Sequence, residues 1–96
     1  MIKDLKAAFE KVEDEYIEFE RIENPICKRP DICAFLLLEK LAPGSHDMIF
    51  AAIHDELYLA ASVEDFANAA TEEDVLFLTR CGVSFDGENE YFTMFV

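Results

Sequence analysis

The apolar residues of this chain come in short runs. The longest uninterrupted runs, Ile32–Leu38 and Met48–Ile53, hold seven and six residues. A bilayer-spanning helix needs about 20 consecutive apolar residues, so neither run can cross a membrane. Because 52% of the 96 residues are hydrophobic and nine are Phe, the chain can nevertheless build one packed core, which argues against disorder. We therefore expect short elements around a single core, in one domain that covers residues 1–96.

The N-terminal segment has the apolar spacing of a helix. Its apolar residues recur at alternating intervals of three and four positions: Ile2, Leu5, Phe9, Val12, Tyr16 and Phe19. This spacing places them on one stripe, with charged residues on the other faces, and predicts a core-facing helix over residues 2–19. The same stripe from Phe9 to Phe19 offers an alternative, in which two copies of the chain pair as a homo-oligomeric structural protein.

A second helix is expected after a loop. Asn24-Pro25 and Arg29-Pro30 are typical of loop segments. Asp31 then has the chemistry of an N-cap for a helix over residues 32–41. This stretch is apolar nearly all round, which predicts a central position in the fold, and Pro43-Gly44 marks its end.

Two hairpins follow. The runs 48–53 and 57–61 flank a polar break at His54-Asp55-Glu56, which favours a hairpin, although the alanines keep a helix open. Residues 83–96 resemble a second hairpin around the turn-rich segment 86–90.

Capping signals predict two short helices between the hairpins. Ser62 with Asp65 resembles a capping box, and Thr71 begins a second helix start that Gly82 would end. The element order therefore predicts an α+β fold: N-terminal helices packed on one face of an antiparallel sheet of about four strands.

Negative charge is concentrated in the second half of the chain. The whole chain has 21 acidic and 8 basic residues, for a net charge of −13. Residues 41–96 contain 11 acids and one base, Arg80, whereas residues 1–40 contain 10 acids and 7 bases. Such a field repels nucleic acids and anionic membranes and attracts basic protein surfaces. We therefore expect a basic protein as partner, with no direct binding to nucleic acid or membrane.

The candidate partner-binding residues combine acids at the two predicted helix starts and the last turn with two tyrosines. They are Glu64, Asp65, Glu72, Glu73, Asp74, Asp86, Glu88, Glu90, Tyr58 and Tyr91. In one interpretation this surface mimics the phosphates of nucleic acid and occupies the basic groove of a protein that handles nucleic acid. In the other it is an ordinary solvated surface whose acids serve helix capping and solubility.

No catalytic motif accompanies the charge, so we expect a non-enzymatic protein without a cofactor. The three glycines are dispersed and form no phosphate-binding loop. The alternative is a metal-dependent hydrolase or metal sensor that uses His46, His54, Asp55 and Glu56, since imidazole and carboxylate bind divalent metals. The eight-residue separation of the histidines is not a recognised ligand spacing.

The cysteines predict reduced thiols. Cys27, Cys33 and Cys81 are odd in number, contain no C-x-x-C pair, and lie in apolar surroundings. The N-terminus alternates charges and does not resemble a signal peptide. We therefore expect a cytoplasmic protein.

The C-terminal half resembles small uncharacterised proteins encoded by bacteriophages and prophages. The matching segments are His54–Leu59, Thr71–Val75, Arg80–Val83 and Met94–Val96. The resemblance covers about half of the chain and implies no activity. It implies a phage accessory protein that engages and inhibits a host factor.

Overall fold

The computed structural model describes residues 2–44 and 46–95. Its elements in chain order are α1 (Leu5–Lys11), the 3-10 turns η1 (Glu13–Glu15) and η2 (Phe19–Arg21), α2 (Pro30–Leu41), β1 (Ile49–Ile53), β2 (Glu56–Leu59), α3 (Val63–Ala69), α4 (Glu72–Arg80), β3 (Val83–Asp86) and β4 (Tyr91–Phe95). None of the described helices has both the length and the apolar composition that crossing a membrane requires.

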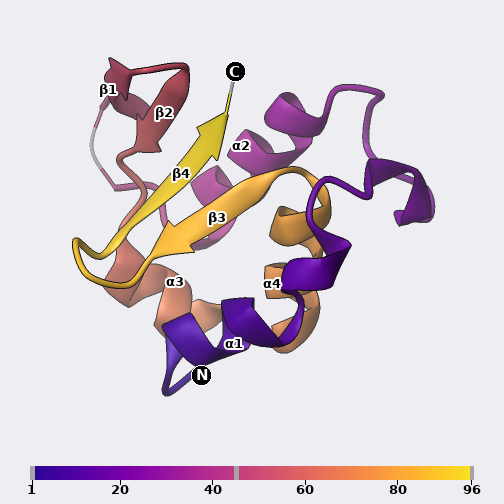
Figure 1. Ribbon diagram of the computed structural model, residues 1–96, viewed down its shortest axis with the longest axis horizontal. Coiled ribbons are helices and arrows are strands. Elements are labelled where there is room, and N and C mark those ends of the chain that lie inside the picture. Colours follow the sequence, from indigo (N-terminus) through magenta and orange to yellow (C-terminus); the bar gives the residue numbers. More distant parts are fainter. Residues whose placement is uncertain (1, 45, 96) are drawn as a thin grey trace.

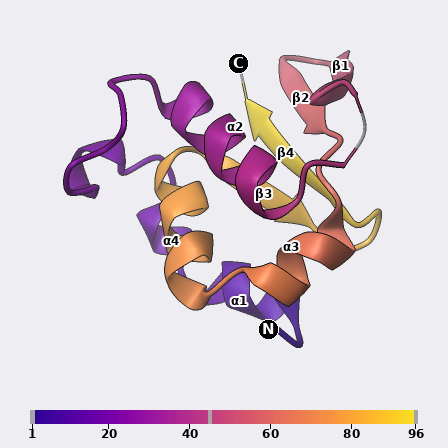
Figure 2. The ribbon, with the colours of Figure 1, turned by 180° about the vertical axis from the view of Figure 1, so that it is seen from behind.

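The four strands form one antiparallel sheet in the order β1-β2-β4-β3. The two hairpins are joined through β2 and β4, where Leu57 lies opposite Met94 and Leu59 opposite Phe92. Helices α2, α3 and α4 cover one face of this sheet, and α1 packs beside β3 (Figures 1 and 2). The predicted α+β fold is therefore confirmed, with its helices on one face.

The core lies between the sheet and the helices, and Phe92 of β4 is at its centre. Its ring centroid is 5.1 Å from that of Phe66 in α3, 5.6 Å from that of Phe85 in β3 and 6.1 Å from that of Phe9 in α1. Each fully buried aromatic or aliphatic side chain contributes about 1.5–3 kcal/mol. The phenylalanines thus tie α1 and α3 to the hairpin of β3 and β4.

The prediction of one helix over residues 2–19 is wrong in its length. Asp4 caps α1 by accepting a hydrogen bond from the Ala7 amide, and the helix ends at Lys11. The chain then continues through η1 to Ile17, whose φ of 58° lies outside the helical region. The apolar stripe still packs on the core, through the buried Phe9 and the partly buried Val12 and Phe19. The apolar periodicity therefore predicted correctly which side chains pack on the core, but tertiary contacts interrupt the helix.

Two predictions about α2 also need correction. The helix begins at Pro30 with Arg29 as its N-cap, so Asp31 lies inside the first turn rather than capping it. Cys33, Ala34 and Leu38 are buried, but Ile32 and Leu36 are exposed. The helix is not central, because it lies on the outside of the fold and buries only one of its faces. Its end agrees with the prediction, since Gly44 adopts a φ of 63° shortly after Leu41.

The hairpin over residues 48–61 is confirmed. Ile53 pairs with Glu56, so His54 and Asp55 form a two-residue turn with φ values of 52° and 63°. Positive φ at both central residues defines a type I′ turn, which matches the twist of antiparallel strands. The second hairpin is confirmed as β3 and β4 up to Phe95, and Val96 lies outside the described residues.

The predicted helix starts at Ser62 and Thr71 are confirmed, but the capping box predicted for Ser62 and Asp65 is only half formed, because the Ser62 amide donates to the Ala42 carbonyl oxygen and not to the Asp65 carboxylate. The Ser62 hydroxyl accepts a hydrogen bond from the Asp65 amide at the start of α3. Thr71 and Asp74 form a complete capping box at the start of α4. Gly82 follows the end of that helix with a φ of 96°, a conformation that favours glycine.

Candidate binding surface

The face of the sheet opposite the helices carries a cluster of aromatic side chains. Strand alternation turns Phe92 and Met94 toward the core, so Tyr91 and Phe95 point to the other face. Tyr58 lies opposite Thr93 and belongs to the same outer face. The outer face therefore presents aromatic side chains from two paired strands, with Phe95 being 61% exposed.

Three of these rings contact one another, and we call them the aromatic triad: Phe50, Tyr58 and Tyr91. The ring centroids of Tyr58 and Tyr91 are 5.0 Å apart, and Phe50 lies 5.8 Å from Tyr91 and 6.1 Å from Tyr58. The Phe50–Tyr91 pair is edge-to-face, an arrangement that aromatic pairs favour. Phe50 is 54% exposed, so the triad is open to solvent on one side.

A bulge in β1 brings Phe50 to this face. The pairing register of β1 with β2 shifts between Ile49 and Ala51. An extra residue in one strand redirects a side chain that simple alternation would point elsewhere. Sequence analysis missed Phe50 for this reason, because period-two alternation cannot locate a bulge.

Carboxylates adjoin the triad. Desolvation by its neighbours raises the pKa of the Tyr58 phenol, and Glu56 raises it further through its negative charge. Desolvation likewise raises the pKa of Tyr91, with a further contribution from Asp86. Both phenols therefore stay neutral at physiological pH, beside two acids on the same sheet.

Asp86 is held in place by the turn that follows it. Its carboxylate accepts hydrogen bonds from the amides of Glu88 and Asn89 at 2.9 and 3.1 Å and from the Asn89 side chain at 3.1 Å. These hydrogen bonds lower the pKa of Asp86, and the bond from the Asn89 side chain contributes most. The turn sequence thus fixes a negative charge at the edge of the outer face.

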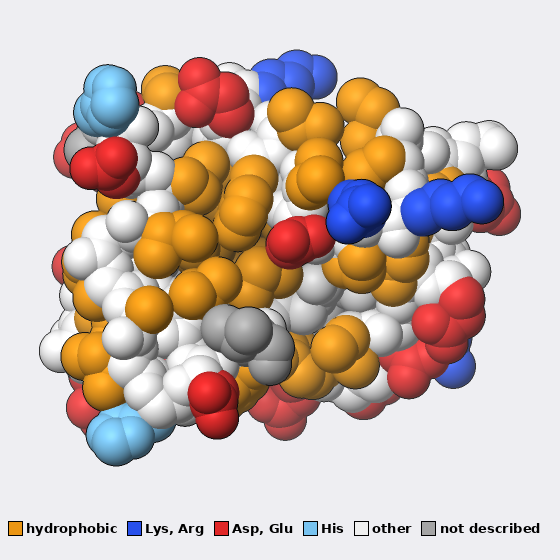
Figure 3. All heavy atoms as spheres, turned by 90° about the horizontal axis from the view of Figure 1, so that it is seen from above, with side chains coloured by type: hydrophobic (Ala, Val, Ile, Leu, Met, Phe, Trp, Pro, Cys, Tyr) orange, Lys and Arg blue, Asp and Glu red, His pale blue; other side chains and the backbone are white. Residues whose placement is uncertain are grey.

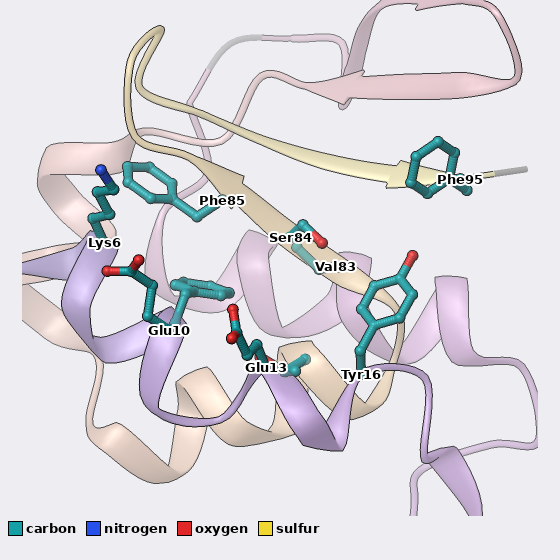
Figure 4. A pocket seen from close by; sticks show the side chains of 10 residues that line it. Lys6, Glu10, Glu13, Tyr16, Val83, Ser84, Phe85 and Phe95 are labelled. Carbon is teal, nitrogen blue, oxygen red and sulfur yellow. The ribbon is translucent and has the colours of Figure 1, made fainter.

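A groove of about 560 Å³ runs along β3 on the α1 side and reaches the outer face at Ser84 and Phe95. Figure 4 shows Lys6, Glu10 and Phe85 at one end, Tyr16 and Phe95 at the other, and Glu13 between them. Phe9 and Val83 also line it. The groove therefore combines an apolar lining with two carboxylates, and it is continuous with the outer face.

The other predicted acids do not gather around the triad. Asp74 is used in the capping box of α4, and Glu72 pairs with Lys11 at 3.1 Å. Glu64 and Glu90 line one hollow together with Lys3 and Lys6. The remaining predicted acids are exposed at the helix starts and in the last turn: Asp65, Glu73 and Glu88. The structure thus brings together Tyr58, Tyr91 and Asp86 from the predicted set and disperses the rest.

The residues of the metal alternative are separated. His54 and Asp55 form the type I′ turn, whereas His46 precedes β1 and lies 3.5 Å from the Asp47 carboxylate. The two histidine side chains occupy separate corners in Figure 3. Among the described residues, no three His, Cys, Asp or Glu side chains are placed to hold a metal ion.

Hydrophobic side chains dominate the face that Figure 3 presents, with few acids among them. The exposed large hydrophobic residues include Ile32 and Leu36 of α2 and Ile49, Phe50 and Ile53 of β1.

The Phe9–Phe19 stripe offers no exposed hydrophobic surface of this kind, because Phe9 is buried and Phe19 is packed against the core. The N-terminal stripe therefore does not form the continuous helix that this mode of pairing requires.

Comparison of the chain with protein-family models, with curated proteins and with solved structures found no match.

Proposed function

We propose that this chain is a non-enzymatic binding protein that docks on a basic protein surface through the aromatic triad and the adjoining carboxylates of Glu56 and Asp86. The observation that carries the proposal is the contact of Tyr58 and Tyr91, at 5.0 Å, on a sheet face that no described helix covers. Solvent-exposed aromatic clusters of this kind supply the anchors of protein interfaces.

The chemistry of the triad favours a partner rich in arginine. A guanidinium group stacks on the face of a tyrosine ring and pairs with a carboxylate through its fork of N–H donors. Tyr58 with Glu56, and Tyr91 with Asp86, offer that combination. The groove extends it, because Glu10 and Glu13 line the side of β3 that opens toward Phe95.

The net charge of −13 supports the same choice of partner. Like charge slows the approach of acidic surfaces, whereas a basic partner is steered toward the chain at a rate that falls with ionic strength. A nucleic-acid-handling protein presents such a basic surface. Together with the resemblance to phage proteins, this choice of partner extends the proposal: the chain is an accessory protein that occupies the basic surface of a nucleic-acid-handling host protein in the cytoplasm.

The test uses short peptides as probes: one rich in arginine, one of equal length rich in lysine, and one acidic. Each is titrated into the isotope-labelled chain and followed by NMR. We expect the arginine peptide to bind most tightly and to shift the amide signals of β2 and β4 and the ring signals of the triad. Binding should weaken as salt is raised, because exposed charges are screened.

A matched pair of variants separates the triad from general charge. Glu56→Gln removes a carboxylate beside Tyr58, and Glu73→Gln removes an exposed carboxylate on α4 with the same change in net charge. The proposal expects the first variant to weaken arginine-peptide binding several-fold and the second to leave it nearly unchanged. Equal weakening by both, or shifts confined to the starts of α3 and α4, would contradict it.

A further inference from the structure

Two of the three cysteines contact each other. Cys27 lies in the loop after η2, and Cys33 is the fourth residue of α2. Their sulfur atoms are 3.3 Å apart, and the Cys33 thiol is also 3.6 Å from the carbonyl oxygen of Cys27. Both are free thiols. A disulfide has a bond of about 2 Å, so a small movement of the loop toward the helix would close the pair.

Exposure distinguishes the two sulfurs. Cys33 is 1% exposed, whereas Cys27 is only half-buried, so a reagent in solution meets Cys27 first. The exposed residues Lys28 and Arg29 follow it, and they are the only two adjacent basic residues in the sequence. Neighbouring cations attract an anionic oxidant. In a chain of net charge −13, this is an unusual local setting.

We propose that Cys27 and Cys33 form a redox-sensitive dithiol that small-molecule disulfides such as glutathione disulfide oxidise to an intramolecular disulfide. The Cys27 thiolate attacks one sulfur of the oxidant, forming a mixed disulfide and releasing one glutathione thiolate. The Cys33 thiol then loses its proton to solvent and attacks the Cys27 sulfur, which expels the second glutathione thiolate. Two protein thiols are thus oxidised while one disulfide is reduced to two thiols.

The closed pair would tie the loop before α2 to the helix itself. Because the cross-link also restricts the unfolded chain, the oxidised form should unfold at a temperature several degrees higher. This proposal is independent of the aromatic triad, since neither cysteine lies on the outer face of the sheet. Dithiols that respond to the glutathione pool are the usual form of disulfide chemistry in a reducing compartment.

Cys81 is the natural control within the chain. It is 2% exposed, and burial raises the pKa of its thiol to about 12. It therefore remains a protonated thiol that neither the oxidant nor a neighbouring disulfide engages readily.

The experiment equilibrates the whole chain with reduced and oxidised glutathione in varying ratio and then alkylates the remaining thiols under denaturing conditions. We expect the number of free thiols to fall from three to one in oxidising buffer. Trypsin cuts after Arg21, Lys28, Lys40 and Arg80, which places the three cysteines in different peptides. Mass spectrometry should find the Cys27 and Cys33 peptides joined, with the Cys81 peptide alkylated.

Cys27→Ser should abolish the joined peptides and the rise in unfolding temperature, whereas Cys81→Ser should keep both. Three alkylated thiols in oxidising buffer would overturn the proposal. A cross-link that contains the Cys81 peptide, or a disulfide between two chains, would overturn it as well. The peptide map of the unaltered chain decides among these results even where a variant fails to fold.

Discussion

The Glu15 carboxylate accepts a hydrogen bond from Nε of Arg80 at 3.0 Å, although 65 positions separate the two residues. Its other oxygen accepts a bond of 2.6 Å from Arg21. The Ile17 amide adds a hydrogen bond of 2.9 Å to the Thr79 carbonyl. Arg80 is the only base among residues 41–96, and it is used to hold the irregular segment after α1 on the end of α4.

This network gives the first prediction, on acid stability. The hydrogen bond from Arg21 and, to a smaller extent, the one from Arg80 lower the pKa of Glu15. A carboxylate whose pKa is lower in the folded than in the unfolded chain stabilises the fold at pH values above its unfolded pKa of about 4.3. This stabilisation is lost as the pH falls through the folded pKa. Glu15→Gln should therefore lower the melting temperature at neutral pH, and the difference should shrink as the pH falls below the unfolded value and the folded carboxylate takes up a proton.

Melting curves of both proteins across this pH range check the prediction. Glu73→Gln is the control, because it removes an equal charge from an exposed position on α4. A constant difference between the unaltered chain and Glu15→Gln at all pH values would contradict the assignment.

The second prediction concerns Gly44. Its φ is 63°, and an added Cβ would collide with the backbone carbonyl of Ala60. Gly44→Ala should lower the free energy of unfolding by about 2–4 kcal/mol, because the backbone cannot move aside and the conformation disfavours L residues. In Gly87→Ala the nearest atoms to the added Cβ belong to the Lys6 side chain, which can rotate aside, so this variant should lower the free energy of unfolding by about 1 kcal/mol or less. Urea unfolding measures both, and equal effects would refute the argument.

A third prediction follows from burial of Cys81, which raises the pKa of its thiol to about 12. Well below the unfolded pKa of about 8.5 the thiol is neutral in both states and adds no pH dependence. Above that pH the unfolded chain ionises while the folded chain does not, so stability falls by roughly 1 kcal/mol per pH unit.

Denaturant unfolding between about pH 8.5 and about pH 10.5 tests this slope. Cys81→Ala should be less stable at neutral pH, by about 1–2 kcal/mol for a small buried side chain, and should show a shallower alkaline decline. Cys27→Ser should keep the steep decline. An unchanged slope in Cys81→Ala would show that other groups cause the alkaline loss.

The fourth prediction separates binding from folding at the aromatic triad. Phe50 is 54% exposed, so Phe50→Ala should cost about 1 kcal/mol of stability or less. It should weaken binding of the arginine-rich peptide several-fold, because the ring contacts both Tyr58 and Tyr91. Calorimetric titration measures the affinity. Leu36→Ala removes an exposed apolar side chain from α2, and an equal loss of affinity there would exclude a specific role for the triad.

The sequence by itself determined the elements whose signals are local. The Thr71–Asp74 capping box, the Ser62 cap and the glycine after α4 lie where their side-chain chemistry placed them. Each of these signals acts within a few residues, so no distant contact can easily displace it.

Only the tertiary structure decided the features that depend on distant partners. The helix that was predicted to reach Phe19 ends at Lys11. Beyond this point Glu15 and Ile17 form hydrogen bonds with residues at the end of α4. The β1 bulge turns Phe50 toward Tyr58 and Tyr91, and folding of the loop brings Cys27 to Cys33. Periodicity reports which side chains are buried, but the pairing of segments far apart in the chain depends on the free energy of the whole fold.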